Sequence, residues 1–502
     1  MSLTLPVSEI VSESDDSLLA IHPSWERVQL GAVATILNGF AFESQYFSNT
    51  SGMPLIRIRD VGNARTECSY SSHFDTRYVV KAGDLIVGMD GDFKCARWKG
   101  PEALLNQRVC KVELASPYYI PMFLQLALPG YLGAINRHTS SQTVRHLSSR
   151  SVAEIPLPLP PLAEQKRIVA KVEELFQHIS APRDRLANVQ LILRRFRQAV
   201  LDAACSGRLT KNWRTEHPDL ESAARLLNRI DEKSKRSRPP QHRTANFQEK
   251  ETGGDMPANW LKSSSIRIFS VETGGTPLRK NPGYYRNGTI PWVKTGEVQN
   301  RDIWAAEEFV TPLALKETNV KVFPPGTILI AMYGEGKTRG QVARLQIEAA
   351  TNQACAALVN PDLPKEMRDY VYYYSLSQYQ HLREKAFGGN QPNLSLGVIK
   401  SWVINIPPLE EQREIVRRVE ALFNMTDAIE KRVEAAAKRA EKLTQAILAK
   451  AFRGELVPTE AELARREGRK YESATELLES IRTASEKRTQ IGGNRSRRGK
   501  PT

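Results

Sequence analysis

The chain has few cysteines, no paired-cysteine motif and no long apolar run. Its five cysteines are scattered, with no C-x-x-C pair and no nearby histidine cluster at zinc spacing. They therefore favour buried thiols in a reducing compartment over a metal site or a disulfide framework. The N-terminal stretch MSLTLPVSEIVSESDDSLLA is acidic and lacks the basic start and apolar core of an export signal, and no apolar stretch approaches membrane-spanning length. We expect a soluble cytoplasmic protein with no membrane partner.

Recognisable catalytic motifs are also lacking. NIPPL (405–409) and PLPPL (158–162) lack the polar residue before Pro-Pro and the aromatic residue after it with which a DNA-adenine methyltransferase holds a flipped base. PDLPK (361–365) contains only isolated pieces of a metal-nuclease site and is typical of a surface turn. We therefore expect no catalytic residue on this chain.

GTILIAMYGEGKT (326–338) comes nearest to a catalytic motif. From Ala331 onward it fits a permissive phosphate-binding loop, with alanine where the first glycine is expected. Arg339 and Gly340 follow, however, and they would disrupt the helix whose N-terminus holds the phosphates. The aligned stretch GDLIVGMDGDFK (83–94) keeps the strand and the lysine but has phenylalanine where the loop needs glycine. We interpret the shared feature as a strand, a tight turn and a lysine that contacts DNA.

Positive charge is in excess. The chain has 71 lysines and arginines against 56 aspartates and glutamates, which gives a net charge of +15. This excess favours a polyanionic partner, and nucleic acid is the first to consider. A soluble basic protein without such a partner is the alternative.

Long stretches of sequence occur twice. PPLAEQKRIVAKVEELF (160–176) returns as PPLEEQREIVRRVEALF (407–423), and the match continues without a gap from RQAVLDAACSGRL (197–209) to TQAILAKAFRGEL (444–456). Repeats of this length decide the architecture before any single motif does. The chain is therefore predicted to have two similar halves, each a variable block followed by a repeated helical block.

Each repeated block has the apolar spacing of a coiled-coil helix. Alternating four- and three-residue steps place one apolar seam on each helix. The predicted seam residues are Ile168, Val172, Leu175, Leu186, Val189, Leu193, Phe196 and Val200 in the first helix, and Ile415, Val419, Leu422, Ile429, Val433, Leu443 and Ile447 in the second. Two such helices in one chain can pair antiparallel, although the core of an ordinary helix bundle is the alternative. Gly207 and Gly454 are predicted to end the two helices.

The variable blocks, 21–159 and 256–406, share little identity but carry the same landmarks. Each begins near a tryptophan that follows a proline, Trp25 in the first block and Trp260 in the second, and continues with a proline-led strand. Short β-rich runs between glycines and prolines predict a twisted antiparallel sheet with a few helices in each block.

The pattern as a whole resembles a known family. The alternation of variable and repeated blocks, and the sequences PPLAEQKRIVAKVEELF, PPLEEQREIVRRVEALF, RRFRQAVLDAACSGRLT and LTQAILAKAFRGEL, are similar to the specificity subunit of type I restriction–modification systems. The resemblance covers nearly the whole chain and is most specific in the helical blocks. It implies a non-catalytic subunit that binds double-stranded DNA, with each variable block reading one half of an interrupted site.

The same resemblance implies partners and cofactors. Two modification subunits would methylate adenine with S-adenosylmethionine, and two restriction (motor-nuclease) subunits would use ATP and magnesium. No cofactor is implied on this chain itself.

The predicted fold class is α+β, with a pseudo-twofold internal repeat. Two mixed α/β target-recognition domains are separated by two long helices that pair as an antiparallel coiled-coil spacer. In chain order, the predicted segments are an N-terminal leader (1–20), target-recognition domain 1 (21–159), the central repeated helical region (160–210), a short helix with a basic linker (211–255), target-recognition domain 2 (256–406), the distal repeated helical region (407–457), and a short helix with a disordered basic tail (458–502).

Candidate DNA-contact residues are chosen by their chemistry. Base reading needs planar bidentate groups such as arginine, asparagine and glutamine, and backbone positioning needs lysine and arginine on exposed turns. The candidates are Asp90, Lys94, Arg97, Lys99, Asn106, Gln107, Arg108, Arg137, Gln142 and Arg145 in the first block, and Tyr333, Lys337, Arg339, Asn352, Gln353, Asn390, Gln391 and Asn393 in the second. For the Asn-Gln pair that both blocks share, side chains that cap a local turn are an equal alternative.

Two other functions remain open at this point. The chain could be the recognition part of a single-protein restriction enzyme, or a decoy that binds DNA or a partner without licensing modification. Co-purification discriminates between them, because a working specificity subunit should bring a methyltransferase with it.

Overall fold

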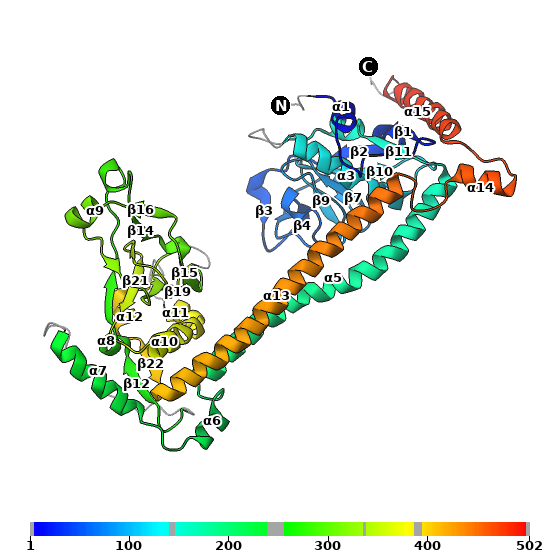
Figure 1. Ribbon diagram of the computed structural model, residues 1–502. Coiled ribbons are helices and arrows are strands. Elements are labelled where there is room, and N and C mark those ends of the chain that lie inside the picture. The colour runs from blue at the N-terminus through cyan, green and yellow to red at the C-terminus, as the bar shows by residue number, and fades with distance from the viewer. Residues whose placement is uncertain (1–4, 140–145, 238–255, 335–337, 386–393, 498–502) are drawn as a thin grey trace. The chain divides into compact units, whose positions relative to one another are not determined.

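The computed structural model describes residues 5–139, 146–237, 256–334, 338–385 and 394–497 (Figure 1). It divides into two compact units, each built from separated parts of the chain. Unit 1 comprises Met1–Leu186 and Ala435–Thr502, and unit 2 comprises Ala187–Glu434. Each unit contains one variable block together with parts of both long helices. None of the described helices is both long enough and apolar enough to cross a membrane.

The variable block of unit 1 is built on small sheets. An antiparallel four-stranded sheet has the order β2 (Ala34–Asn38), β10 (Val109–Leu114), β7 (Leu85–Gly88) and β8 (Cys95–Arg97). A five-stranded sheet has the order β3 (Phe47–Ser48), β5 (Ser69–Tyr70), β4 (Met53–Ile56), β9 (Ala103–Leu105) and β6 (Val79–Val80). The first and last strands of the block, β1 (Glu26–Gln29) and β11 (Pro156–Leu159), pair antiparallel with Glu26 opposite Leu159. Both ends of the block therefore leave it side by side.

The core of unit 1 forms between the four-stranded sheet and α3 (Pro121–His138). Val87 and Cys110 from the sheet share a buried cluster with Phe123 and Tyr131 from α3. Buried residues recur along α3 at three- and four-residue steps, which is the spacing of one helix face. The other short helices of this block are α1 (Val7–Ser12), α2 (Leu30–Val33), α4 (Ser149–Ala153), and the 3-10 turns η1 (Ser44–Tyr46), η2 (Ile58–Asp60) and η3 (Thr76–Tyr78).

The variable block of unit 2 repeats this design. A five-stranded sheet has the order β13 (Ser270–Thr273), β21 (Cys355–Val359), β18 (Ile328–Ala331), β19 (Val342–Leu345) and β15 (Arg301–Ile303). A four-stranded sheet has the order β16 (Glu308–Val310), β14 (Ile290–Val293), β20 (Ala349–Thr351) and β17 (Val322–Phe323). The closing pair is β12 (Leu261–Ser264) with β22 (Val403–Ile406), in which Leu261 lies opposite Ile406.

The core of unit 2 forms between its five-stranded sheet and α10 (Lys365–Ser377). Ile330 and Leu358 from the sheet share a buried cluster with Met367 and Tyr370 from α10. The remaining helices of the block are α8 (Ser265–Ile268), α9 (Pro312–Glu317), α11 (Tyr379–Lys385), α12 (Leu396–Lys400), and the 3-10 turns η5 (Pro282–Tyr284) and η6 (Thr295–Glu297).

The two blocks share one framework although their sequences differ. β4 pairs parallel with β9, and β14 pairs parallel with β20. A 3-10 turn follows β4 and β14 in each case, and the carboxylates of Asp60 and Glu297 accept a backbone N–H at its start. The expectation of wholly antiparallel sheets is therefore wrong for these strands. The long chain between β4 and β9 supplies the crossover connection that a parallel pair requires.

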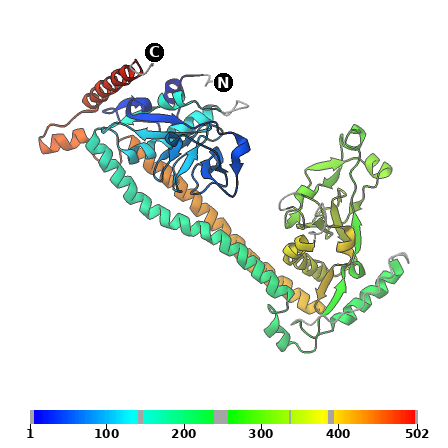
Figure 2. The same ribbon diagram turned by 180° about the vertical axis from the view of Figure 1, so that it is seen from behind.

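The repeated blocks form two continuous 44-residue helices, α5 (Leu162–Cys205) and α13 (Leu409–Phe452). In unit 1 the start of α5, at Ile168, shares a buried cluster with the end of α13, at Phe452. In unit 2 the end of α5, at Val200, shares a buried cluster with the start of α13, at Ile415. The helices are therefore antiparallel within each unit, and Figure 2 shows them side by side.

The contact between the long helices departs from the predicted heptad seam at one equivalent position in each repeat. Phe196 in α5 is 36% exposed and Leu443 in α13 is 52% exposed. The half-buried positions are the next residues, Arg197 and Thr444. An ideal α-helix has 3.6 residues per turn, so a contact line on a straight helix drifts off a strict seven-residue repeat. The prediction that Phe196 and Leu443 belong to the seam is therefore wrong, and the contact uses the next residue along each helix.

Both long helices end at the predicted glycines. Gly207 and Gly454 have φ angles of 76° and 71°, in the left-handed region that favours glycine at a helix end. The chain then forms a short and a longer helix in each unit: α6 (Lys211–Glu216) and α7 (Ala223–Ser237), then α14 (Glu460–Glu467) and α15 (Ala474–Arg497).

The helix α15 extends beyond the short helix predicted for 458–502 and into the segment that was expected to be a disordered tail. It begins at the cap of Ser473, whose side chain accepts the N–H of Glu476, and it continues to Arg497. Leu477 and Ile481 are buried in the core of unit 1. These two anchors and the cap stabilise the first part of the helix, where the sequence predicts a short helix.

Candidate nucleic-acid interface

The lysine-bearing turns join antiparallel strands in both blocks. In unit 2 the turn after Tyr333 connects β18 to β19, and in unit 1 the equivalent turn connects β7 to β8. A phosphate-binding loop needs a helix directly after it, because the N–H groups of the first helical turn hold the phosphates. In both blocks the next described element is a strand, β19 or β8, and not the helix that a nucleotide site requires.

The turn in unit 1 is anchored by its aromatic residue. Phe93 is buried in the core of unit 1 and has a φ of 46°, which is uncommon for a bulky residue. Burial of the ring holds this backbone conformation in place. The next residue, Lys94, is exposed and available to a phosphate. Its counterpart Lys337 lies outside the described residues.

The Asn-Gln pairs divide their roles between structure and surface. Asn106 is buried, and its Oδ1 accepts the backbone N–H of Gln107 at 2.7 Å. Asn352 is half-buried, and its Oδ1 accepts the hydroxyl of Thr295 at 2.8 Å. Gln107 and Gln353 are exposed. Asn106 therefore caps its own turn, whereas Asn352 binds a residue 57 positions away. The Gln353 side chain, although exposed, accepts the hydroxyl of Thr276.

The other predicted contact residues lie at several places on the two blocks. Arg97 in β8 donates to Gln125 Oε1 at 2.5 Å and to the carbonyl of Gly83 at 2.8 Å, so part of its guanidinium is used within the protein. Arg137 at the end of α3 is exposed and forms an ion pair with Asp16. Lys99 is exposed and Arg339 is half-buried. Gln142, Arg145, Asn390, Gln391 and Asn393 lie outside the described residues.

One group of predicted residues is brought together. Asp90, in the turn after β7, accepts a hydrogen bond from Arg108 Nη1 in the turn before β10. Its other carboxylate oxygen lies 2.6 Å from Nδ1 of His146, which pairs with Asp90 as an isolated β-bridge. Asp90 and Arg108 were predicted from the sequence, whereas His146 was not. No pattern in the sequence marks this histidine, because its role depends on a contact across 56 positions.

A buried joint fixes each variable block to the long helices of its own unit. In unit 1, Trp25 Nε1 donates to Glu164 Oε1 at 3.1 Å, and the N–H of Glu460 donates to Glu164 Oε2 at 3.0 Å. In unit 2, Trp260 Nε1 donates to Glu411 Oε2 at 2.9 Å. The joint was missed in the sequence, although the tryptophans and the Glu-Gln dipeptides recur in both halves.

The two joints differ in charge. Burial raises the pKa of the Glu164 carboxyl, whose nearest donors are the neutral N–H groups of Trp25 and Glu460. Glu411 instead has the guanidinium of Arg214 at 2.6 Å and the hydroxyl of Thr210 at 2.7 Å. The same tryptophan–glutamate contact therefore serves both halves with different electrostatic support.

Burial keeps four of the five cysteines in the thiol form. Burial raises the pKa of Cys95, Cys110, Cys205 and Cys355 to about 12. A nucleophilic or metal-binding cysteine needs a thiolate, and these groups are protonated near neutral pH. They are structural residues, as their scattered positions in the sequence indicate.

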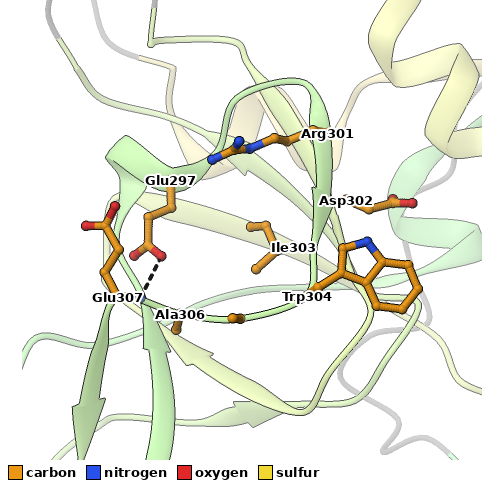
Figure 3. A pocket seen from close by; sticks show the side chains of 8 residues that line it. Glu297, Arg301, Asp302, Ile303, Trp304, Ala306 and Glu307 are labelled. Atoms are coloured by element: carbon orange, nitrogen blue, oxygen red, sulfur yellow. Dashed lines mark hydrogen bonds between the residues drawn. The ribbon is translucent and has the colours of Figure 1, made fainter. Parts of the chain in front are cut away.

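A hollow of about 480 Å³ lies beside β15 in unit 2 (Figure 3). Its lining includes the carboxylates of Glu297, Asp302 and Glu307 against the single cation of Arg301, and Trp304 beside it is 70% exposed. The Glu297 carboxylate accepts the N–H of Glu307 at 3.0 Å, as the dashed line in Figure 3 marks. Glu307 pairs with Lys294 at 3.1 Å and Asp302 pairs with Arg344 at 2.9 Å, so two of these carboxylates are already neutralised within unit 2.

Comparison with known proteins gives one consistent result. The family model for the type I restriction modification DNA specificity domain matches residues 23–190 and 257–439. The chain is 35% identical to the type I restriction enzyme EcoBI specificity subunit of Escherichia coli over 100% of both chains. It is 28% identical to the EcoKI specificity subunit of Escherichia coli strain K12, over 95% of this chain and 98% of that one. A solved structure from a study of complex assembly and conformational transition of the type I R-M system matches with a TM-score of 0.55 at 20% identity. The match covers 87% of this chain and 99% of that chain, and it shows that the two chains have the same fold.

Proposed function

The chain belongs to the type I restriction–modification DNA specificity family, and from that membership we propose that it is the DNA-reading subunit of such a system. Each matched segment contains one variable block. The two blocks would therefore read the two halves of an interrupted DNA site, one half each. The identity of 35% over the full length of both chains, with a protein named as a specificity subunit, is the observation that carries the proposal.

The chemistry of the chain supports a reading role without catalysis. Its net charge of +15 suits a polyanionic partner. The turn closest to a phosphate-binding loop joins two strands, and burial raises the pKa of four of the five cysteines to about 12. Methylation and cleavage are therefore assigned to partner subunits, and this chain is proposed to recognise the DNA sequence.

The proposed partners follow from the family. Two modification subunits would carry S-adenosylmethionine and methylate adenine, and two motor-nuclease subunits would use ATP and magnesium on unmodified DNA. On this chain the proposal places no cofactor, and its surfaces would bind double-stranded DNA and those subunits.

Methylation-aware sequencing tests the proposal directly. Host DNA with the gene should show methylated adenines in a bipartite motif, and DNA from a strain in which only this gene is deleted should lose that motif. Purification of the tagged chain should also bring a methyltransferase with it.

Two results would contradict the proposal. An unchanged methylome after deletion, with the partner genes intact, would indicate a decoy. DNA cleavage by the purified chain alone would indicate a single-protein restriction enzyme.

A further inference from the structure

The two variable blocks share one backbone junction beside the lysine-bearing turn. In unit 1, the N–H of Met89 donates to the carbonyl of Arg108 at 2.9 Å, and the N–H of Leu147 donates to the carbonyl of Met89 at 2.7 Å. In unit 2, the N–H of Met332 donates to the carbonyl of Ala354 at 2.8 Å, and the N–H of Leu394 donates to the carbonyl of Met332 at 3.1 Å. Three chain segments therefore meet at the same place in both blocks.

The inward side of this junction is the same in both blocks. Met89 and Leu147 are buried in unit 1, and Met332 and Leu394 are buried in unit 2. A serine follows each leucine and caps the next short helix, α4 or α12, by accepting a backbone N–H. Such agreement between two blocks of low identity shows that this part of each block is fixed by the fold.

The outward side of the junction differs completely. The residue after the methionine is Asp90 in unit 1 and Tyr333 in unit 2, and the residue that accepts the methionine N–H is Arg108 or Ala354. Arg108 and Tyr333 are exposed. A fixed backbone that presents different side chains is what a domain needs in order to read different bases at one geometrically defined position.

From this contrast we infer that the junction is a base-reading position in both blocks, and that Arg108 reads a guanine there while Asp90 orients it. The inference rests on the proposed function, because it assigns a base to a chain taken to read DNA. Arginine is the side chain that most often reads guanine, through two parallel hydrogen bonds to O6 and N7 in the major groove.

The ion pair argues for a base edge and against a phosphate contact. Asp90 neutralises Arg108, and a carboxylate this close to the DNA backbone would be repelled by it. His146 holds the other oxygen of Asp90 at 2.6 Å, so the carboxylate is fixed from two sides. Within the described part of the chain, no protein atom accepts a hydrogen bond from Arg108 Nε or Nη2. These donors keep the planar fork that guanine matches.

The same position in unit 2 has different chemistry. Tyr333 offers a phenol and Ala354 a methyl group, and neither has the fork of an arginine. The inference therefore assigns guanine recognition at this position to the first half-site and not to the second.

Selection from a pool of duplexes tests the inference with the full chain. The probe is double-stranded DNA with a randomised central region, and bound duplexes are sequenced. The wild-type chain should enrich a bipartite motif with a guanine in one half-site. Arg108→Ala removes every donor that could read guanine, so it should reduce the preference for guanine over the other bases at one base pair by roughly 5- to 150-fold. All other positions should keep their preferences.

Two further variants separate base reading from folding. Asp90→Asn keeps the shape of the side chain and removes the charge that orients Arg108, so it should weaken the preference at the same base pair to a smaller extent. Arg77→Ala is the matched control, because Arg77 is also an exposed arginine of this block, paired with Asp75 at 3.0 Å. The control should leave every base preference unchanged.

The outcomes distinguish failure of the proposed function from failure of the inference about Arg108. If the wild-type chain enriches no bipartite motif, the proposed function fails. If it enriches one and Arg108→Ala leaves all base preferences intact, or lowers affinity equally for every sequence, Arg108 does not read a base and the inference is overturned.

Discussion

Gly207 and Gly454 each meet two requirements at a single residue. Their positive φ angles end the long helices, and each lies against the residues that lead into a variable block. A Cβ at Gly207 would come within 2.6 Å of Pro257 Cγ, and a Cβ at Gly454 within 2.8 Å of His22 Cδ2. Glycine therefore allows the helix end and the start of the block to touch directly in each unit.

Alanine at Gly207 should cost more stability than a helix end alone explains. The positive φ costs about 1–2 kcal/mol for a residue with a Cβ, and the contact with Pro257 adds to that cost. Gly468 is the control, because it ends α14 with a φ of 62° and has no atom within 4 Å of an added Cβ. We expect Gly207→Ala to lower the free energy of unfolding, measured by urea denaturation, by more than Gly468→Ala does. Equal losses would show that the contact has no effect.

Lys94 gives a prediction about charge. If its ammonium group neutralises one DNA phosphate, Lys94→Ala should weaken binding to all sequences alike and reduce the slope of log affinity against log salt concentration by about one. Lys81→Ala is the control, because Lys81 is an exposed lysine of the same block that already pairs with Glu102 at 3.6 Å. Binding titrations from low to high salt measure both slopes. An unchanged slope for Lys94→Ala would remove this lysine from the interface.

Residue types were more predictable than residue roles. Asn106 and Gln107 were equivalent candidates in the sequence, yet the first is buried under a local turn and the second is exposed. Similarly, Asp90 and Arg108 were selected for their chemistry, but their contact with His146 depends on the folded chain. Local propensity does not encode which of two adjacent polar residues points inward, because that is decided by strand register.

At the scale of elements, the existence and ends of the long helices could be predicted from the sequence. The face of each helix that contacts the other helix could not. Apolar spacing and a terminal glycine determine a helix and its end. The side that faces the partner also depends on whether the helices supercoil, which a count of seven-residue steps assumes in advance. Phe196 and Leu443, equivalent in the repeat, were assigned to the seam on that assumption, and both are exposed.

Two alanine substitutions can show which face of α13 is buried. Leu443 is 52% exposed, whereas Ile447 is buried against the core of unit 1. Ile447→Ala should lower the free energy of unfolding by about 2–5 kcal/mol, as for other buried isoleucines. Leu443→Ala should cost less than about 1 kcal/mol, because it removes little buried surface. Thermal or urea unfolding of both variants is the measurement, and equal costs would restore the heptad seam.

At the scale of the whole molecule, the repeat makes each variable block a replaceable part. The first and last strands of a block pair with each other, β1 with β11 and β12 with β22. The tryptophan before each block contacts a glutamate in the repeated helices. The attachment of each block therefore uses residues that recur in both halves, and the base-reading surface is free to vary.

Exchange of one block should change one half of the recognised site. Replacing residues 21–159 with the block of a relative that keeps a tryptophan at the position of Trp25 preserves the bond to Glu164, so the new block should attach as the old one does. The methylated motif should then change in one half and stay the same in the other, which methylome sequencing measures. The same exchange with phenylalanine in place of that tryptophan is the control for attachment. It leaves a buried carboxylate without one donor, which should cost about 1–3 kcal/mol of unfolding free energy, and its methylated motif should be the same as that of the first exchange. A motif that changed in both halves after the first exchange would show that the two blocks do not read DNA independently.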